Sequence, residues 1–181
     1  QTTHLADILR EVPGVAVNRS GGPGAVTNIR IRGAESNHTV VLIDGIEVNN
    51  PAGESFFDFG HLLADDVERI EVLRGPQTVL YGSEAVGGVI NIITKKGSGR
   101  PSIGGSIEGG SFGTGKANAS LSTAGERYNA YLSATHFRTD GISVARDGDE
   151  SDGYENTTAF AKFGVNPVEN LELDFVGRYT G

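Results

Sequence analysis

The densest group of reactive side chains in this sequence is a run of acids between residues 147 and 155. These nine residues include five carboxylates, at Asp147, Asp149, Glu150, Asp152 and Glu155. Carboxylates this close repel one another unless solvent or a cation screens them, and oxygen ligands on a loop suit Ca²⁺. The spacing is not that of an EF-hand, which needs glycine at Asp152 and glutamate at Thr158. Two interpretations stay open: a solvated acidic loop, or a calcium site formed by Asp147, Asp149, Glu150 and Asp152.

The patterns that would indicate an enzyme are incomplete. Ser83 lacks the second glycine of a G-x-S-x-G elbow. The stretch from Gly82 to Gly88 ends without the Gly-Lys-Ser/Thr of a phosphate loop. The histidines are scattered without metal-ligand spacing, at positions His4, His38, His61 and His136. We therefore expect no enzymatic activity and assign no catalytic residue.

The composition excludes some classes of protein and leaves others open. The formal net charge of −8 leaves no basic face for phosphates, so we expect no nucleic-acid partner. The absence of cysteine removes disulfides and thiolate metal sites. Glycine, at 27 of 181 residues, predicts many turns and close backbone contacts. No stretch approaches the roughly 18 apolar residues of a membrane helix, but membrane strands alternate and escape that measure.

The first half of the chain mixes helix and strand. Leu5, Ile8, Leu9 and Val12 lie on one face of a predicted helix that Pro13-Gly14 ends. Asp44-Gly45 predicts a tight turn between two strands. Gly- and Asn-rich loops are predicted at 20–24 and 49–55, and a short helical turn carrying aromatic residues at 56–63. Further strands are predicted at 15–17, 28–32, 39–44, 69–73 and 89–94.

From about residue 102 the pattern changes to strict alternation. It predicts five strands of roughly ten residues, the length that crosses a bilayer when a strand is tilted. Their linkers tend to alternate between short, such as 124–126, and long, such as 138–155. A soluble antiparallel sheet with one face on a core alternates in the same way. Periodicity alone therefore leaves both kinds of sheet open.

Four segments together resemble the plug of TonB-dependent outer-membrane receptors. They are LADILREVPGVAV, IRIRG, VVLIDGIEVN and VERIEVLRGPQTVLYGSEAVGGVINIITKK, and they occur in the family's order. The resemblance covers about the first hundred residues. The second half is similar to the first barrel strands of the family, and particularly of its cobalamin-transporter branch, where a comparable acidic loop binds Ca²⁺.

The resemblance implies an α+β plug domain over residues 1–98 and, over 99–181, the first five or so strands of a 22-stranded transmembrane β-barrel. It implies a Gram-negative outer-membrane receptor that takes up cobalamin or a ferric siderophore, energised by TonB. The TonB-gripped segment should precede the first helix, and the barrel should continue beyond Gly181. We therefore expect a fragment, incompetent for transport, that self-associates through open sheet edges.

The resemblance also suggests functional residues. The expected ligand-binding residues lie in two apical loops, at Ser20, Gly21, Gly22, Asn49, Asn50, Ser55 and Phe56. An ionic network between plug and barrel is expected at Arg30, Arg32, Glu68, Glu71 and Arg74. Ordinary turn chemistry and an exposed strand face are the simpler readings of these two sets. The rival for the whole chain is a soluble extracellular Gly-rich β module that binds glycan or calcium.

Overall fold

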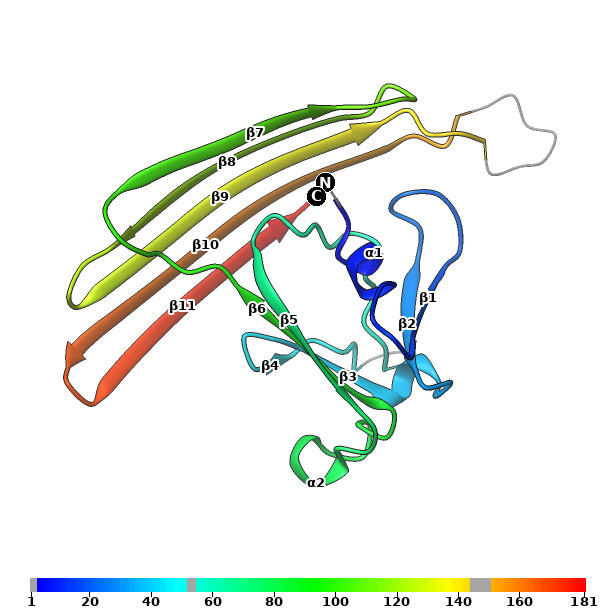
Figure 1. The fold of residues 1–181 in the computed structure, drawn as a ribbon, viewed down its shortest axis with the longest axis horizontal. Coiled ribbons are helices and arrows are strands. Elements are labelled where there is room, and N and C mark those ends of the chain that lie inside the picture. The colour runs from blue at the N-terminus through cyan, green and yellow to red at the C-terminus, as the bar shows by residue number, and fades with distance from the viewer. Residues whose placement is uncertain (1–2, 52–54, 144–150) are drawn as a thin grey trace. The chain divides into compact units, whose positions relative to one another are not determined.

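The chain divides into two compact units, Gln1–Thr94 and Lys95–Gly181, which we describe separately. The computed structural model describes residues 3–51, 55–143 and 151–181 (Figure 1). None of the helices among these residues is long and apolar enough to cross a membrane.

The first unit combines a β-ribbon, a four-stranded sheet and short helices. The ribbon pairs β1 (Val15–Arg19) with β2 (Thr27–Ile31) in antiparallel fashion. The sheet has the order β4-β3-β6-β5, in which β3 and β6 are parallel. Its strands are β3 (Thr39–Ile43), β4 (Ile46–Glu47), β5 (Val67–Arg74) and β6 (Gly88–Thr94). The helices are α1 (Leu5–Leu9), the 3-10 turn η1 (Ser36–His38) and α2 (Thr78–Tyr81).

The predicted turn at Asp44-Gly45 is confirmed. Both residues have positive φ, 51° and 83°, and Ile43 pairs directly with Ile46 across the two-residue loop. This conformation matches the right-handed twist of the strands and explains the Asp-Gly pair. The Asp44 carboxylate also accepts hydrogen bonds from the backbone N–H and the hydroxyl of Thr94, at 2.9 and 2.5 Å. It therefore ties the hairpin turn to the end of β6.

Two local predictions in the first unit are wrong. The helix α1 ends at Leu9, whereas the pattern extended it to Val12, although Val12 still packs against the core. Residues 56–63 do not form the predicted helical turn, apart from a single turn at Gly60 and His61. The reason is that Phe59 N–H donates to the Thr27 carbonyl of β2, at 2.9 Å, rather than to its own segment.

The core of the first unit is built from distant parts of the chain. Leu5, Leu9, Ile31, Phe59 and Ile90 are all almost completely buried in one cluster. The rings of Phe57 and Phe59 meet edge to face, with centroids 4.8 Å apart. The predicted helix face, the ribbon, the aromatic segment and β6 therefore share one hydrophobic core.

The second unit is a five-stranded antiparallel sheet, in the strand order β11-β10-β9-β8-β7 (Figure 1). The strands are β7 (Ser102–Gly109), β8 (Gly115–Ala124), β9 (Tyr128–Thr139), β10 (Tyr154–Val168) and β11 (Leu171–Thr180). The five strands are confirmed. β10 is longer than predicted and carries an irregularity between Val165 and Val168, next to Pro167, where proline cannot donate to the ladder.

Candidate functional site

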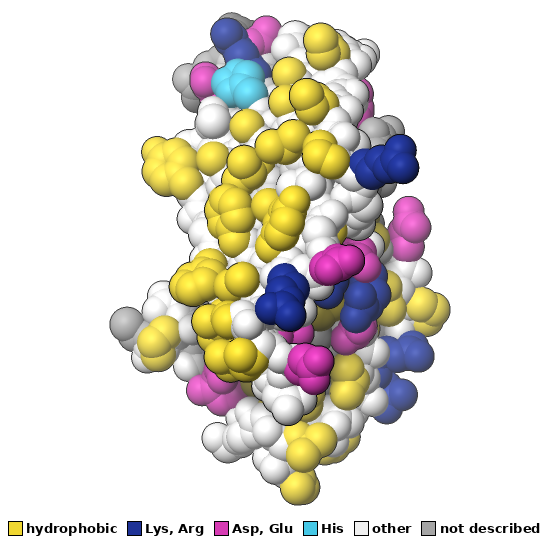
Figure 2. All heavy atoms as spheres, turned by 90° about the vertical axis from the view of Figure 1, so that its left-hand side faces the viewer, with side chains coloured by type: hydrophobic (Ala, Val, Ile, Leu, Met, Phe, Trp, Pro, Cys, Tyr) yellow, Lys and Arg dark blue, Asp and Glu magenta, His cyan; other side chains and the backbone are white. Residues whose placement is uncertain are grey.

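The five-stranded sheet exposes an apolar face and buries a face on which polar and aromatic side chains are mixed. Ile107, Phe175 and Tyr179 are 90%, 62% and 66% exposed. The opposite face is buried and carries polar side chains, Lys116, Thr135, Asn156, Thr158 and Lys162, together with three aromatic ones, Tyr131, Phe137 and Phe160. Figure 2, which views the molecule from the left-hand side of Figure 1, shows a run of exposed hydrophobic side chains. A sheet packed on a soluble core has the reverse arrangement. Apolar residues outward and polar residues inward is the pattern of a transmembrane barrel wall.

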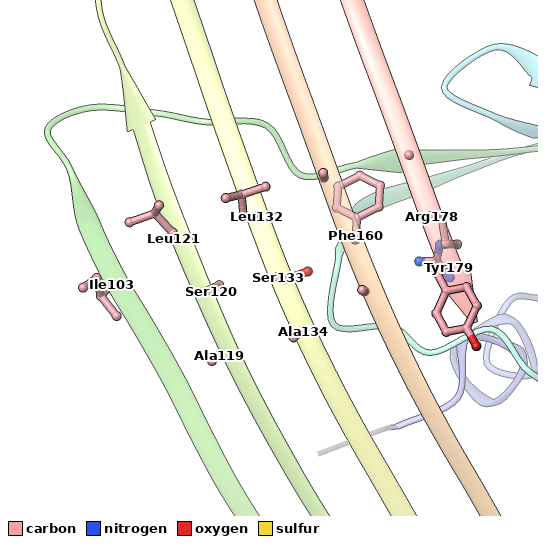
Figure 3. Close-up of a pocket in the computed structure, with 13 residues that line it drawn as sticks. Ile103, Ala119, Ser120, Leu121, Leu132, Ser133, Ala134, Phe160, Arg178 and Tyr179 are labelled. Carbon is pink, nitrogen blue, oxygen red and sulfur yellow. The ribbon is translucent and has the colours of Figure 1, made fainter. Parts of the chain in front are cut away.

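Small residues form a shallow hollow in the exposed face. The hollow has a volume of about 840 Å³ and contains Ala119, Ala134, Ala159 and Ala161. Figure 3 shows its lining spread across the strands, from Ile103 on β7 to Tyr179 on β11. It is broad and mainly apolar, although Ser120, Ser133 and Arg178 also line it.

The first candidate loop, Ser20–Gly24, connects the two strands of the ribbon. Ser20 N–H donates to the Val26 carbonyl, 3.0 Å away, which closes the loop at its base. Gly24 has a φ of +80°, a conformation that suits glycine. At Gly22, by contrast, a Cβ would meet nothing within 4 Å, so there is open space beside this residue. The structure places Ser20, Gly21 and Gly22 together at this tip.

The second candidate loop, Asn49–Phe56, is held by the side chain of Asn49. Its Oδ1 accepts from Val41 N–H at 2.7 Å, and its Nδ2 donates to the Thr39 and Ser55 carbonyls at 3.0 and 2.8 Å. Asn49 is only 9% exposed, so its amide serves the loop itself. Asn50 is exposed, and Ser55 and Phe56 are half-buried. Residues 52–54 lie outside the described part of the chain.

Sequence reasoning missed two residues that join these loops. The Oδ1 atom of Asp58 accepts from Thr27 N–H at 2.9 Å and from Gly60 N–H at 2.8 Å. A Cβ at Gly60 would lie 2.5 Å from the Ala25 carbonyl oxygen, so only glycine fits there. The segment that leaves the second loop therefore crosses the base of the first. An Asp-Phe-Gly run after a predicted loop is ordinary turn chemistry, so the sequence carried no specific signal.

Four of the five residues of the predicted ionic network fall into two separate groups, and Arg30 belongs to neither. Arg32 and Arg74 flank the turn at Pro13-Gly14: Arg74 Nη1 donates to the Pro13 carbonyl at 2.7 Å. A Cβ at Gly14 would lie 3.8 Å from Arg32 Cγ and 4.0 Å from Arg74 Cδ. Within the described ranges, no ion pair joins either arginine to a carboxylate. Arg30 is exposed on β2.

The two glutamates of the predicted network form ion pairs with Arg69, a residue that the prediction did not include. Arg69 pairs with Glu68 at 3.5 Å and with Glu71 at 2.9 Å. The hydrogen bond from Arg69 lowers the pKa of Glu71 most, and Asn91, whose Nδ2 donates at 3.2 Å, lowers it further. Arg69 and Glu71 lie two residues apart on β5, hence on one face. The two-residue spacing of Arg69 and Glu71 was the feature of the sequence that could have predicted this ion pair.

Most of the predicted calcium site lies outside the described residues. Asp147, Asp149 and Glu150 fall within 144–150, whereas Asp152 is described and exposed. In the described parts of the chain, no group of three or more His, Asp or Glu side chains could hold a metal ion. At the mouth of this loop, Arg138 and Asp140 form an exposed ion pair of 3.5 Å.

The fold and its faces define a plug domain followed by wall strands of an outer-membrane receptor. Residues 1–89 match the family described as the TonB-dependent Receptor Plug Domain. The chain therefore belongs to the TonB-dependent receptors, a family of transport receptors rather than enzymes.

Among individual proteins, the chain is similar to vitamin B12 transporters named BtuB. It is 36% identical to the protein from Vibrio vulnificus over 90% of its length, and 32% identical to that from Photobacterium profundum over 99%. These alignments cover 27% and 30% of the two relatives. The chain thus spans less than a third of the curated relatives it matches.

Solved structures agree on the fold. The siderophore receptor PirA from Pseudomonas aeruginosa is 29% identical, with a TM-score of 0.65 over 98% of this chain and 32% of PirA. The pyoverdine receptor FpvA from the same species has a TM-score of 0.77 at 19% identity, over 98% of this chain and 25% of FpvA. Because FpvA is only 19% identical to this chain, the similarity to FpvA shows a shared fold and nothing more.

Proposed function

We propose that this chain supplies the plug and the first wall strands of a receptor that takes up cobalamin across the outer membrane. Residues 1–98 act as the plug and 99–181 begin the barrel wall. The observation that carries the proposal is the five-stranded sheet, whose exposed face is apolar and whose buried face holds most of its polar side chains together with three aromatic ones. Such a sheet suits lipid on one side and a polar lumen on the other.

Cobalamin is preferred over a ferric siderophore because of sequence similarity. The relatives at 36% and 32% identity are vitamin B12 transporters, whereas the siderophore receptor PirA is 29% identical. In this proposal the ligand meets Ser20, Gly22, Asn50 and Phe56 on the two candidate loops. TonB supplies the energy, the plug gates the barrel, and the receptor performs no covalent chemistry.

Uptake of radiolabelled cyanocobalamin by cells that express the full-length protein tests this function. The host should lack its own cobalamin receptor, and a matched host should also lack TonB. We expect uptake that requires both the protein and TonB, and a Phe56→Ala variant with about tenfold weaker binding, since stacked aromatic contacts contribute strongly to affinity. Uptake of ferric siderophores instead would reassign the ligand. Recovery of the protein in the soluble fraction would support a secreted β module.

The two arginines beside Pro13-Gly14 are proposed to bind carboxylates of the barrel wall. Guanidinium groups need acidic partners once they are shielded from water, and no ion pair joins Arg32 or Arg74 to a described carboxylate. Replacing Arg32 and Arg74 by alanine should loosen the plug and raise ion conductance in planar bilayers. Arg10→Ala, an exposed arginine on the same unit, serves as the control.

The acidic loop is proposed as a calcium site formed by Asp147, Asp149, Glu150 and Asp152. The support is the local density of carboxylates, which repel one another without a cation. Calorimetric titration of the purified protein with Ca²⁺ tests it. Heat that disappears in the double variant Asp149→Asn/Asp152→Asn is the expected result. A titration without heat, or heat that survives in that variant, contradicts the proposal.

A further inference from the structure

The turn between β7 and β8 contains a residue that its backbone conformation does not favour. Phe112 and Gly113 have φ of +58° and +62°, and Thr114 N–H donates to the Ser111 carbonyl at 3.2 Å. A two-residue turn with positive φ at both central residues prefers Asn, Asp or Gly at the first of them. Asp44-Gly45, the corresponding turn of the first unit, follows this preference. Phe112 does not, although a bulky side chain is strained in the left-handed region.

Packing does not compensate for the strain at Phe112. The residue is 64% exposed, so its ring buries little of the apolar area that would stabilise the fold. Asparagine at this position would suit the turn and would expose no apolar surface. A residue that breaks a local rule without a gain in packing is expected at functional sites. The exposed ring itself therefore requires an explanation.

The end of β9 fixes the strained turn in place. Asp140 N–H donates to the Phe112 carbonyl at 2.9 Å, and the Thr139 hydroxyl donates to the same oxygen at 3.4 Å. The hydroxyls of Thr114 and Thr139 share a hydrogen bond of 2.8 Å. A Cβ at Gly113 would overlap the Asp140 carboxylate. These contacts hold the backbone of Phe112 in one conformation, so that its ring is presented from a fixed support.

The turn lies at the end of the sheet where β9 ends and β10 begins (Figure 1). At this end residues 140–153 connect the two strands, whereas only 125–127 and 169–170 form the connections at the opposite end. Long connections mark the extracellular end of outer-membrane barrels. Phe112 is bonded at the level of the exposed ion pair between Arg138 and Asp140, which places it in aqueous surroundings rather than in the lipid layer.

We propose that Phe112 is a ligand-contact residue at the extracellular end of the receptor, where its ring packs against an apolar face of the arriving ligand. An aromatic side chain supplies a large contact area on a stiff support, which is what a binding anchor requires. In cobalamin the matching group is the flat corrin ring. The identity of the ligand rests on the proposed function. The contact itself lies outside the two candidate loops of the first unit.

Equilibrium binding of cyanocobalamin to the purified full-length protein in detergent tests this contact. The wild type is compared with Phe112→Asn. Asparagine suits the left-handed turn, so the variant should unfold at the same temperature as the wild type or at a higher one. The variant lacks the ring, so its affinity should fall about tenfold. A purely structural role for Phe112 would not combine unimpaired stability with weaker binding.

Two further variants serve as controls. Phe112→Tyr keeps the ring and should bind cyanocobalamin within about twofold of the wild type. Phe175→Ala removes a ring that is 62% exposed on the apolar face of the same sheet, and should leave the affinity unchanged. The pair distinguishes the ring at the turn from exposed aromatic surface in general.

The outcomes that overturn the inference are distinct. Unchanged affinity in Phe112→Asn would remove the contact, and an equal loss in Phe175→Ala would make the effect non-specific. A lower unfolding temperature together with weaker binding would assign Phe112 a structural role. If the wild type binds no cyanocobalamin, the proposed function fails and this contact fails with it. Wild-type binding that survives the loss of the ring overturns this inference alone.

Discussion

At the scale of single residues, Asn49 shows how a polar side chain in a ligand loop can serve the loop itself. Its amide makes three hydrogen bonds to backbone groups and is almost fully buried. It therefore shapes the loop from which Asn50 and Phe56 are presented. Composition could predict a polar loop, but only the fold distinguishes the inward asparagine from its exposed neighbour.

Asn49→Ala should destabilise the first unit by about 2 kcal/mol, because it leaves buried backbone groups without their partner. Urea unfolding of the purified protein measures this change. Asn18→Ala, at an exposed position of β1, should cost less than about 0.5 kcal/mol. Equal losses for the two variants would contradict the assigned role of Asn49.

Glu71 makes a pH-dependent contribution to stability. Its pKa lies below the ordinary value of 4.5, first because of the hydrogen bond from Arg69 and then because of that from Asn91. A depressed carboxylate pKa stabilises the fold above the unfolded-state value, and this contribution disappears as the pH falls through the folded-state pKa. The side chain is solvent-exposed, so the effect is small and salt-dependent.

The test compares thermal unfolding of wild type and Glu71→Gln at several pH values. At pH 7 the variant should unfold at a lower temperature, since it lacks the charge that binds Arg69. Well below pH 4.5 the two curves should converge. A difference that stays constant across this range would show that Glu71 does not contribute through its charge.

At the scale of elements, glycine permits a close approach between strands β5 and β6. Gly88 has a φ of +153°, and a Cβ there would lie 2.3 Å from the Leu73 carbonyl oxygen of β5 and 3.0 Å from Ile31 Cδ1. Gly88→Ala should therefore cost about 3 kcal/mol through strain and overpacking. The midpoint of urea unfolding measures it.

Gly22 provides the matched control for this substitution. Its backbone shows no left-handed φ, and a Cβ would meet nothing within 4 Å. Gly22→Ala should change stability by less than about 0.5 kcal/mol. Similar losses at Gly22 and Gly88 would indicate that backbone entropy, rather than the close approach, determines the cost.

Sequence patterns predicted the elements better than their pairing. The Asp44-Gly45 turn and the five alternating strands follow from local rules, and both are present. The parallel pairing of β3 with β6 joins Thr39 to Gly88 and has no local signal. The helix α2 in the connector was not predicted, and the aromatic segment after the second loop was mistaken for a helical turn.

The loops and charged residues of the candidate site could be predicted, but the hydrogen bonds, close contacts and ion pairs that join them could not. The two loops and the two arginines could be proposed from the resemblance, while the roles of Asp58, Gly60 and Arg69 could not. Each of these depends on which backbone or carboxylate the fold brings near: Thr27, Ala25 and Glu71, respectively. Such proximity depends on tertiary packing rather than on residue type.

At the scale of the whole molecule, the exposed apolar face predicts depth-dependent tolerance to charge. Leu132→Arg places a guanidinium in the middle of that face, where lipid contact would make it cost about 2–4 kcal/mol. His136→Arg lies four residues along β9, beside the exposed Glu155, and should cost little. Folding into lipid vesicles, followed by urea titration, compares them. Equal costs would argue against lipid contact.

The position of β6 within its sheet determines when the first unit can complete its fold. In the order β4-β3-β6-β5, the hairpin of β3 and β4 meets β5 only through β6, which is the last of the four strands to be synthesised. Ile90 and Ile92 of that strand also complete the core around Leu5 and Phe59. A nascent chain that has not yet reached Thr94 thus lacks its central strand and stays open. Because β6 supplies the pairing for both β3 and β5, a chain ended at Gly87 should remain unfolded by circular dichroism.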